Sequence, residues 1–425
     1  MKKYILVPDS FKGTISSRRV CEIIKEELLA ADPTAQVIAL PVADGGEGTV
    51  EAFLSAMEGA GASAERVECR VQGPFGAPAD SFWGLVRPGS SDEQLTAVIE
   101  MAACAGLPMA RQLGEPNPEK TTTYGVGQLI RQALDQECQK IVVGLGGSAT
   151  NDGGCGAAAA LGARFLDEFE NEFVPTGGTL KNIARVDLSG MDPRLQKTEI
   201  VAMCDVENPL CGANGAAAVF GPQKGADPEM VRRLDEGLAH LAEVWQKEAA
   251  ATNLNAAAVQ MRPPAKNAAA DGNVAAACEN AAADLTAMPG SGAAGGMGFG
   301  LCAFLGAKLE PGIEVVLDLT GFDRLAKGAD WIITGEGSFD HQSLQGKVIS
   351  GVGKRGRKLR IPLLVVAGRW GRDVTTEDLR RFGIRRVFVT NKRRLPMEKV
   401  RLRAEQDLRE AVQELIVYIE RRERL

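Results

Sequence analysis

Side chains with the chemistry to bind an anion are concentrated in one stretch, residues 144–156, where glycines alternate with small polar residues. An apolar run at residues 141–143 precedes it and an alanine-rich run follows it, which is typical of a buried strand, a glycine loop and a helix. The first N–H groups of a helix have no partner inside it and carry partial positive charge, so they favour anions. We therefore predict contacts with phosphate from Gly146, Gly147, Ser148, Thr150, Asn151 and Asp152. The alternative is a glycine-rich packing turn that binds no ligand.

Polar loops also follow two short apolar runs near the N-terminus, at residues 4–7 and 37–42. Both runs have the length and composition of buried strands. Ligands bind at the carboxyl ends of the strands in open α/β sheets, so these loops are candidates for the substrate site. The predicted substrate-binding residues in them are Ser10, Lys12, Asp44 and Glu47.

Two later strand-like runs end in charged loops. Residues 200–203 lead to Asp205, and residues 331–333 lead to a loop with Glu336, Asp340 and Lys347. Lysines, carboxylates and glycine loops together are typical of phosphoryl transfer, where positioning and charge stabilisation do most of the catalysis. One carboxylate can take the proton of an attacking hydroxyl, and others can hold Mg²⁺.

This pattern yields the remaining site predictions. The predicted catalytic residues are Asp44, Asp205, Lys347 and Lys12, with Asp44 and Asp205 also as magnesium ligands and Asp340 as a further substrate contact. A second glycine-rich stretch at residues 290–300 can also approach a nucleotide closely, through Gly292, Gly295 and Gly296. The dipeptide Gly346-Lys347 is followed by Val348, so it is not part of a P-loop motif.

Two other functions are compatible with the same residues. Gly144, Gly146 and Ala149 after a strand match a relaxed dinucleotide fingerprint, and Asp167 stands near the place of the ribose-binding acid, so an NAD(P)-dependent dehydrogenase is one alternative. A nucleotide-binding regulatory protein without turnover is the other. In that protein the lysines and carboxylates would form structural ion pairs.

Strand and helix patterns alternate regularly at both ends of the chain, while the middle is patterned differently. We predict an α/β fold with a discontinuous Rossmann-like or flavodoxin-like parallel-sheet domain, residues 1–66 and 287–425. A second α/β domain, residues 67–286, is inserted into it, and the active-site cleft lies between the two. Residues 314–317 are expected to form a strand, and the Ala/Asn-rich residues 249–286 a flexible insert.

The composition of the chain indicates which kinds of partner and which cellular compartment to expect. The formal net charge of −6 over 425 residues disfavours a nucleic-acid partner. Nine scattered cysteines without a C-x-x-C pair are typical of a reducing compartment. The chain lacks a signal-peptide-like start and a long apolar segment, so we expect a cytoplasmic protein without a membrane partner. We also expect that the chain can form a homo-oligomer.

The chain resembles a known family, the type I glycerate kinases of bacteria. The resemblance is carried by blocks spread over the whole chain: PDSFKG at residues 8–13, ADGGEGT at 43–49, GLGGSATNDGG at 144–154, CDVENPL at 204–210, PGSGAAGG at 289–296 and TGEG at 334–337. It implies a similar two-domain fold and ATP-dependent phosphorylation of D-glycerate, typically at the 2-hydroxyl, giving 2-phosphoglycerate and ADP with Mg²⁺. Two departures are the longer segment at 249–286 and the residues Phe339 and His341.

Overall fold

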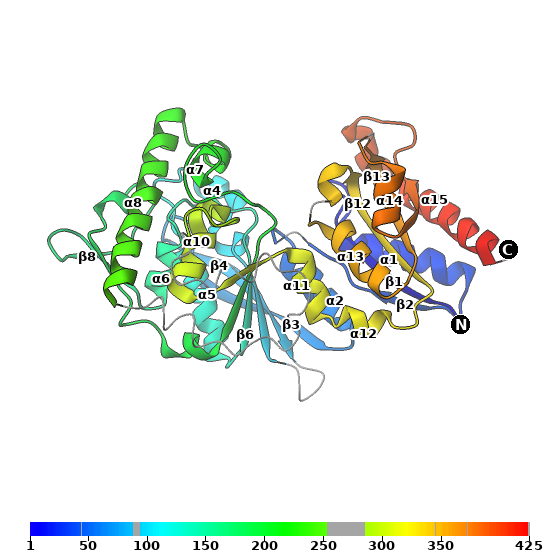
Figure 1. Ribbon diagram of the computed structural model, residues 1–425, viewed down its shortest axis with the longest axis horizontal. Helices are drawn as coiled ribbons and strands as arrows, with labels where there is room; N and C mark the ends of the chain where they lie inside the picture. The colour runs from blue at the N-terminus through cyan, green and yellow to red at the C-terminus, as the bar shows by residue number, and fades with distance from the viewer. Residues whose placement is uncertain (44, 88–93, 253–284, 345, 372, 424–425) are drawn as a thin grey trace.

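The computed structural model describes residues 1–43, 45–87, 94–252, 285–344, 346–371 and 373–423. It contains two large β-sheets, with helices between them and helices on both outer faces (Figure 1). The fold is α/β, which confirms the class predicted from the alternating patterns. None of the helices in these described ranges is long and apolar enough to cross a lipid bilayer.

The first sheet has five parallel strands in the order β14-β13-β12-β1-β2. Its strands are β1 (Lys3–Pro8), β2 (Gln36–Ala39), β12 (Trp331–Phe339), β13 (Leu363–Trp370) and β14 (Ile384–Val389). The chain adds β2 on one side of β1 and then β12, β13 and β14 on the other, which is the flavodoxin order. The reversal between β1 and β12 opens a crevice at their carboxyl ends, where doubly wound sheets bind ligands.

The second sheet has six strands in the order β11-β10-β6-β5-β4-β3. They are β3 (Ser63–Gln72), β4 (Pro78–Arg87), β5 (Thr96–Glu100), β6 (Lys140–Gly144), β10 (Glu199–Met203) and β11 (Lys308–Glu310). Strands β5, β6, β10 and β11 are parallel, and β4 and β3 are antiparallel to their neighbours. The carboxyl ends of the four parallel strands therefore share one edge.

This sheet extends beyond the inserted domain expected from the sequence. Its first strand begins at Ser63, and its last strand, β11, follows α10 (Ala293–Leu305), whose side chains pack in the same core. The expected domain limits stay a prediction, but β11 pairs with β10, and α10 packs in the core of the second sheet. A smaller antiparallel sheet is formed by β7 (Arg164–Leu166), β8 (Glu172–Phe173) and β9 (Arg185–Asp187).

A layer of helices lies between the two large sheets, in the middle of Figure 1. It contains α2 (Thr49–Gly59), α11 (Gly312–Leu319), α12 (Phe322–Ala326) and α13 (Val348–Lys358). Buried side chains of these helices form one apolar cluster with a face of each sheet, including Ile332 of the first and Val142 of the second. The central strands of the second sheet, β5, β6 and β10, are buried on both faces, which explains their continuous apolar runs.

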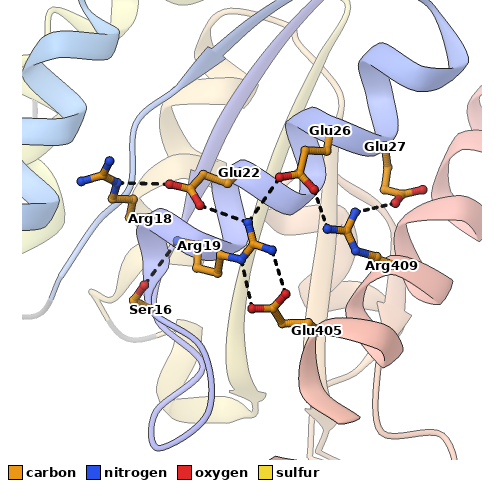
Figure 2. Close-up of polar contacts among 8 residues, drawn as sticks. All are labelled: Ser16, Arg18, Arg19, Glu22, Glu26, Glu27, Glu405 and Arg409. Atoms are coloured by element: carbon orange, nitrogen blue, oxygen red, sulfur yellow. Dashed lines mark hydrogen bonds and ion pairs between the residues drawn. The ribbon is translucent and has the colours of Figure 1, made fainter.

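Helices also cover the outer faces. The outer face of the second sheet packs against α5 (Tyr124–Asp135), α6 (Cys155–Ala160), α8 (Pro228–Thr252) and α10. The outer face of the first sheet packs against α1 (Ser17–Ala31) and α15 (Met397–Glu423). Figure 2 shows an ion-pair network that joins α1 to α15 through Arg19, Glu26, Glu405 and Arg409. The shorter helices are α3 (Ala102–Ala105), α4 (Leu107–Leu113), α7 (Ala216–Phe220) and α14 (Thr376–Arg381).

The strand expected at residues 314–317 is wrong, because these residues lie in helix α11. Ile313, Val315, Val316 and Leu317 are all buried in the layer between the sheets. A short apolar run has the same pattern in a buried strand and in a buried helix, so periodicity alone could not distinguish them. Most of the expected flexible insert, residues 253–284, lies outside the described residues.

Candidate active site

A cavity of about 870 Å³ lies where the carboxyl ends of the two sheets face each other. The first sheet contributes Ser10 and Lys12 from the loop after β1 and Glu336, Asp340 and Lys347 from β12 and the loop after it. The second sheet contributes residues 146–148 after β6 and Asp205 after β10. Candidate residues that are far apart in the sequence therefore line one cavity.

The loop after β1 is held by backbone hydrogen bonds. The Asp9 N–H donates to the Gly335 carbonyl at 2.8 Å, which continues the pairing of β1 with β12. Phe11 and Ile15 form an isolated β-bridge, and the Thr14 hydroxyl donates to the Phe11 carbonyl at 2.6 Å. These bonds fix the backbone from which Ser10 and Lys12 reach the cavity.

The loop between β12 and α13 is a compact polar turn. The Asp340 carboxylate accepts hydrogen bonds from the Ser338 hydroxyl at 3.2 Å and from the Gln342 N–H at 3.0 Å. The Ser343 hydroxyl accepts from the Asp340 N–H at 3.1 Å and donates to the Ser338 carbonyl at 3.1 Å. Both Asp340 and Gln342 line the cavity. This turn sets the position from which α13 begins.

Lys347 occupies the N-cap position of α13, and within the described chain no side-chain hydrogen bond caps that helix end. Ser, Thr, Asp and Asn are the usual N-cap residues, and the helix dipole makes the N-terminus unfavourable for a cation. A lysine there, at the wall of a cavity, is explained if an anion lies between its ammonium group and the helix N–H groups. The geometry therefore favours a phosphate at this end of α13.

Glu336 is a cavity residue near the carboxyl end of β12, and only 9% of it is exposed. Burial raises the pKa of its carboxyl group to about 7. The Ser343 hydroxyl and the Lys347 charge oppose this increase, whereas the negative charges of Asp9 and Asp340 add to it. Its Oε1 atom has no hydrogen-bond partner among the residues that the structure describes.

On the opposite wall, Asp205 follows β10 and lies at the start of α11. The Gly312 N–H, in the first turn of that helix, donates to Asp205 Oδ1 at 2.9 Å. Beside it, the Gly146 N–H donates to the Gly45 carbonyl at 2.8 Å, so the loop after β6 is bonded to the loop before α2. A Cβ at Gly146 would lie 2.6 Å from the Gly46 Cα, so this position needs a glycine for close packing.

The later residues of the 144–156 stretch point away from the cavity. Asp152 is completely buried and accepts hydrogen bonds from the Thr123 N–H at 2.7 Å, the Thr123 hydroxyl at 2.8 Å, and the N–H groups of Gly154 and Gly156, each at 3.3 Å. Burial raises the pKa of Asp152, and these hydrogen bonds oppose the increase. Its carboxylate therefore joins the N-terminal ends of α5 and α6 in the core.

Thr150 and Asn151 are also buried, and neither lines the cavity. The Thr150 hydroxyl and both amide atoms of Asn151 lack hydrogen-bond partners within the described part of the chain. Of the six phosphate contacts predicted in this stretch, the cavity is lined by Gly146, Gly147 and Ser148.

The second glycine-rich stretch packs against the first. The Gly153 N–H donates to the Gly295 carbonyl at 3.1 Å. Gly295 has a φ of +72°, and a Cβ there would lie 2.0 Å from the Thr150 carbonyl oxygen. Gly292, Gly295 and Gly296 are not among the residues that line the cavity, although the adjacent Ala293 and Ala294 are. Close backbone packing accounts for these glycines, and their contact with a nucleotide stays a prediction.

The 43–49 block contains two of the predicted site residues, Asp44 and Glu47. Asp44 lies outside the described residues. Glu47 is exposed and is not among the described residues that line the cavity.

The polar residues that line the cavity and that the sequence analysis did not select include Lys224, Arg369 and Asn391. Arg369 is near the end of β13 and Asn391 follows β14, so both obey the strand-end pattern that found the others. Lys224 is only 1% exposed and donates to the Thr150 carbonyl at 2.6 Å. Burial lowers the pKa of Lys224 to about 7, against the attraction of Asp152. No sequence pattern distinguished this lysine from those on the surface.

The fold and the cavity define a two-domain α/β enzyme. Its charged cleft lies between the carboxyl ends of the parallel strands of the two sheets. The model of the glycerate kinase family matches residues 4–420. The chain therefore belongs to the glycerate kinase family, and this confirms the resemblance found in its sequence blocks.

Individual relatives agree with this assignment. The chain is 40% identical over 371 residues to the glycerate kinase of Halalkalibacterium halodurans, covering 87% of this chain and 86% of the relative. It is 40% identical over 386 residues to the glycerate 2-kinase of Escherichia coli K12, covering 91% and 90%. A crystal structure of a candidate glycerate kinase 2 from Salmonella typhimurium LT2 is similar with a TM-score of 0.78 and 36% identity, covering both chains completely.

The structure disfavours the dehydrogenase alternative, because the acid expected to bind the ribose has another role. Asp167 follows β7, and its carboxylate accepts hydrogen bonds from the N–H groups of Phe169 and Asn171 at 2.9 and 2.8 Å. These contacts stabilise the β7–β8 turn, and Asp167 is not among the described residues that line the cavity.

Proposed function

We propose that this protein transfers the terminal phosphoryl group of ATP to the 2-hydroxyl of D-glycerate, giving 2-phosphoglycerate and ADP. The observation that carries this proposal is the cavity in which Lys12, Asp205 and Lys347 come together from both sheets. Phosphoryl transfer needs cations for the moving charge and a cleft that keeps water out. The relatives named above as glycerate kinases and glycerate 2-kinase support the choice of substrate.

The two walls of the cavity suggest different roles. Lys12 and Ser10 supply a cation and a hydroxyl for the glycerate carboxylate, which needs charged or polar donors. Gly146, Gly147 and Ser148 supply backbone and hydroxyl groups for the nucleotide phosphates. Lys347 and the N-terminal end of α13 lie where they can stabilise the group in transfer.

The acidic side chains of the cavity are compatible with a bound Mg²⁺ ion. Among the described residues, no group of three or more His, Cys, Asp or Glu side chains has the arrangement of a metal site. Mg²⁺ at kinase sites is usually held by one or two carboxylates together with substrate phosphates and water. A single carboxylate, that of Asp205, is therefore sufficient for this pattern. When bound, the ion would neutralise phosphate charge, with Asp205 as its proposed protein ligand and Asp44 as a second one predicted from the sequence.

The test is an assay of the purified protein with ATP, Mg²⁺ and D-glycerate, in which ADP release is followed by a coupled reaction. The product is then given to enolase alone, which consumes 2-phosphoglycerate and leaves 3-phosphoglycerate unchanged. ADP release with consumption of the product by enolase is the expected result. ADP release without consumption would contradict the proposed position of transfer, and no ADP release would contradict the activity.

The remaining expectations are proposals about context. We propose a cytoplasmic location because the nine cysteines are scattered along the sequence without a C-x-x-C pair, which is typical of a reducing compartment. A homo-oligomer and the lack of a nucleic-acid partner stay predictions.

A further inference from the structure

The position of Glu336 in β12 directs its side chain toward α13. Alternate residues of this strand face opposite sides of the first sheet. Ile332 packs in the cluster with α13, and Ile333 packs on the other face with α1 and α15. Glu336 is an even number of residues from Ile332 and therefore has its orientation. At the carboxyl end of the strand, that direction leads to the cavity and the first turn of α13.

Of the other described acids that line the cavity, Asp407 pairs with Arg403 at 3.0 Å, and the remaining three accept hydrogen bonds that hold the backbone. Asp340 uses both carboxylate oxygens for the turn before α13, accepting from Ser338 and Gln342. Asp205 Oδ1 accepts from the Gly312 N–H. Asp9 Oδ1 accepts from the N–H of the next residue at 2.6 Å.

Glu336 differs from these acids because its Oε1 is buried and has no hydrogen-bond partner in the described ranges. A buried carboxylate oxygen without a donor costs free energy, so it is unfavourable for stability. The cost is explained if the oxygen accepts a proton or a hydrogen bond from a bound molecule. Such atoms in a cleft are candidates for function.

The charged groups around Glu336 lie after β1, after β12, at the start of α13 and in β13. Asp9 follows β1, Asp340 precedes the turn, and Lys347 begins α13, while Arg369 of β13 also lines the cavity. Burial and the two acids raise the pKa of Glu336 to about 7, and Lys347 limits the increase. A base with a pKa near 7 is suited to proton transfer at neutral pH.

We propose that Glu336 is the general base that takes the proton from the attacking hydroxyl of the substrate. In this step the hydroxyl O–H bond breaks and its proton moves to the Glu336 carboxylate, while the oxygen forms a bond to the γ-phosphorus of ATP. The bond from that phosphorus to the bridging oxygen breaks, and its electron pair leaves on ADP. Glu336 then releases the proton to solvent through the cavity. This inference rests on the proposed kinase activity.

The experiment compares the wild-type protein with Glu336→Gln over pH 5.5 to 9. Glutamine has nearly the same shape but cannot accept the proton, so kcat should fall about 100-fold or more. In the wild-type protein log kcat should rise through an apparent pKa near 7 on the acidic side, and Glu336→Gln should lack this rise. The affinity for ATP, measured by calorimetry, should change by less than about threefold.

Glu336→Asp tests the same role in a second variant, because it retains a carboxylate at a longer distance. It should have a reduced kcat that still depends on pH. The melting temperature of each variant reports whether it is folded.

Glu100→Gln is the matched control. Glu100 is 2% exposed, and burial raises its pKa to about 7 as well, but its carboxylate accepts from the Val50 N–H at 3.0 Å and is not among the described residues lining the cavity. This variant should keep kcat within about threefold and retain the wild-type pH profile.

Three outcomes would overturn the proposal. One is a folded Glu336→Gln protein with kcat within threefold of wild type. A second is recovery of its activity at high Mg²⁺ concentration, which would make Glu336 a metal ligand. A third is an unchanged acidic side of its pH profile. A wild-type protein that releases no ADP with D-glycerate would overturn the proposed function, and this inference with it.

Discussion

The glycine loop (residues 144–156) and the β12–α13 segment (residues 334–347) contain similar kinds of side chains but use them differently. In the glycine loop, Asp152 is saturated by four donors of the protein itself. In the β12–α13 segment, Glu336 has an oxygen without a partner in the described chain, and Lys347 stands at a helix end that favours anions. Most of the glycine loop therefore stabilises the fold, and only residues 146–148 line the cavity. The β12–α13 segment instead supplies reactive side chains to the cavity.

The difference shows that burial and a raised pKa do not identify a functional acid. Asp152, Glu100 and Glu336 are all buried, and burial raises the pKa of each. Glu336 differs from the other two because it lines the cavity and because its Oε1 has no hydrogen-bond partner among the described residues. Substitutions at these acids and at other charged residues can break or sharpen this comparison.

The largest expected effect is that of Lys347→Met, in the β12–α13 segment. Loss of a cation that stabilises the transferring phosphoryl group should lower kcat by about 100- to 1,000-fold. The melting temperature should stay nearly unchanged, because the ammonium group is at the cavity wall. Steady-state kinetics and differential scanning calorimetry are the measurements. Lys354→Met, at an exposed position of the same helix, is the control. Equal losses of kcat in both variants would show that the effect does not come from the position of Lys347 at the cavity.

Next in size is the effect of Asp152→Ala, in the glycine loop. It leaves the Thr123 N–H and hydroxyl buried without their acceptor, so the free energy of unfolding should fall by about 3 kcal/mol. Urea denaturation measures this change. The folded fraction should retain kcat within about tenfold. A stable Asp152→Ala protein that has lost turnover would show that this end of the glycine loop takes part in catalysis.

A smaller effect concerns the dependence of stability on pH. The pKa of Glu100 is raised from 4.5 to about 7 in the folded protein, so the folded state binds the proton more tightly than the unfolded state. The stabilisation that the folded protein gains from binding this proton is therefore fully present below about pH 4.5. It is lost as the pH rises through 7.

Glu100→Gln cannot titrate, so its unfolding free energy should decrease between pH 5 and 8 by about 2 kcal/mol less than that of wild type. Glu336→Gln should flatten the stability profile in the same direction, because its pKa is also raised to about 7. Chemical denaturation at a series of pH values measures both. If Glu100→Gln also removed the pH dependence of kcat, satisfied and unsatisfied buried acids would not differ in function.

The smallest effect provides a baseline for both regions. Arg19→Ala removes the centre of the network in Figure 2, where Arg19 pairs with Glu22, Glu26 and Glu405. Exposed ion pairs contribute little, so the melting temperature should change by no more than about 2 °C and kcat should not change. Arg18→Ala, which removes one exposed pair with Glu22, is its control. A much larger decrease for Arg19→Ala would show that the packing of α1 on α15 depends on these charges.

Local patterns predicted the strands and their polar ends well. The ends of β1, β6, β10 and β12 were found from apolar runs followed by glycines and charged residues, and Lys12, Asp205 and Lys347 do line one cavity. The same reasoning gave a strand at residues 314–317, where the structure has α11, because an apolar run this short has no distinctive period.

The sequence by itself determined the α/β class, the positions of the strand ends and the family, because these depend on local patterns and on blocks of residues along the chain. Only the tertiary structure decided which polar side chains belong to the cavity and which belong to the core. Whether an acid is satisfied depends on donors brought by distant segments, such as Thr123 for Asp152 and Gly312 for Asp205. The same packing buries Lys224 against the Thr150 carbonyl and leaves Glu336 Oε1 without a donor among the described residues, and no neighbouring residue in the sequence indicates either environment.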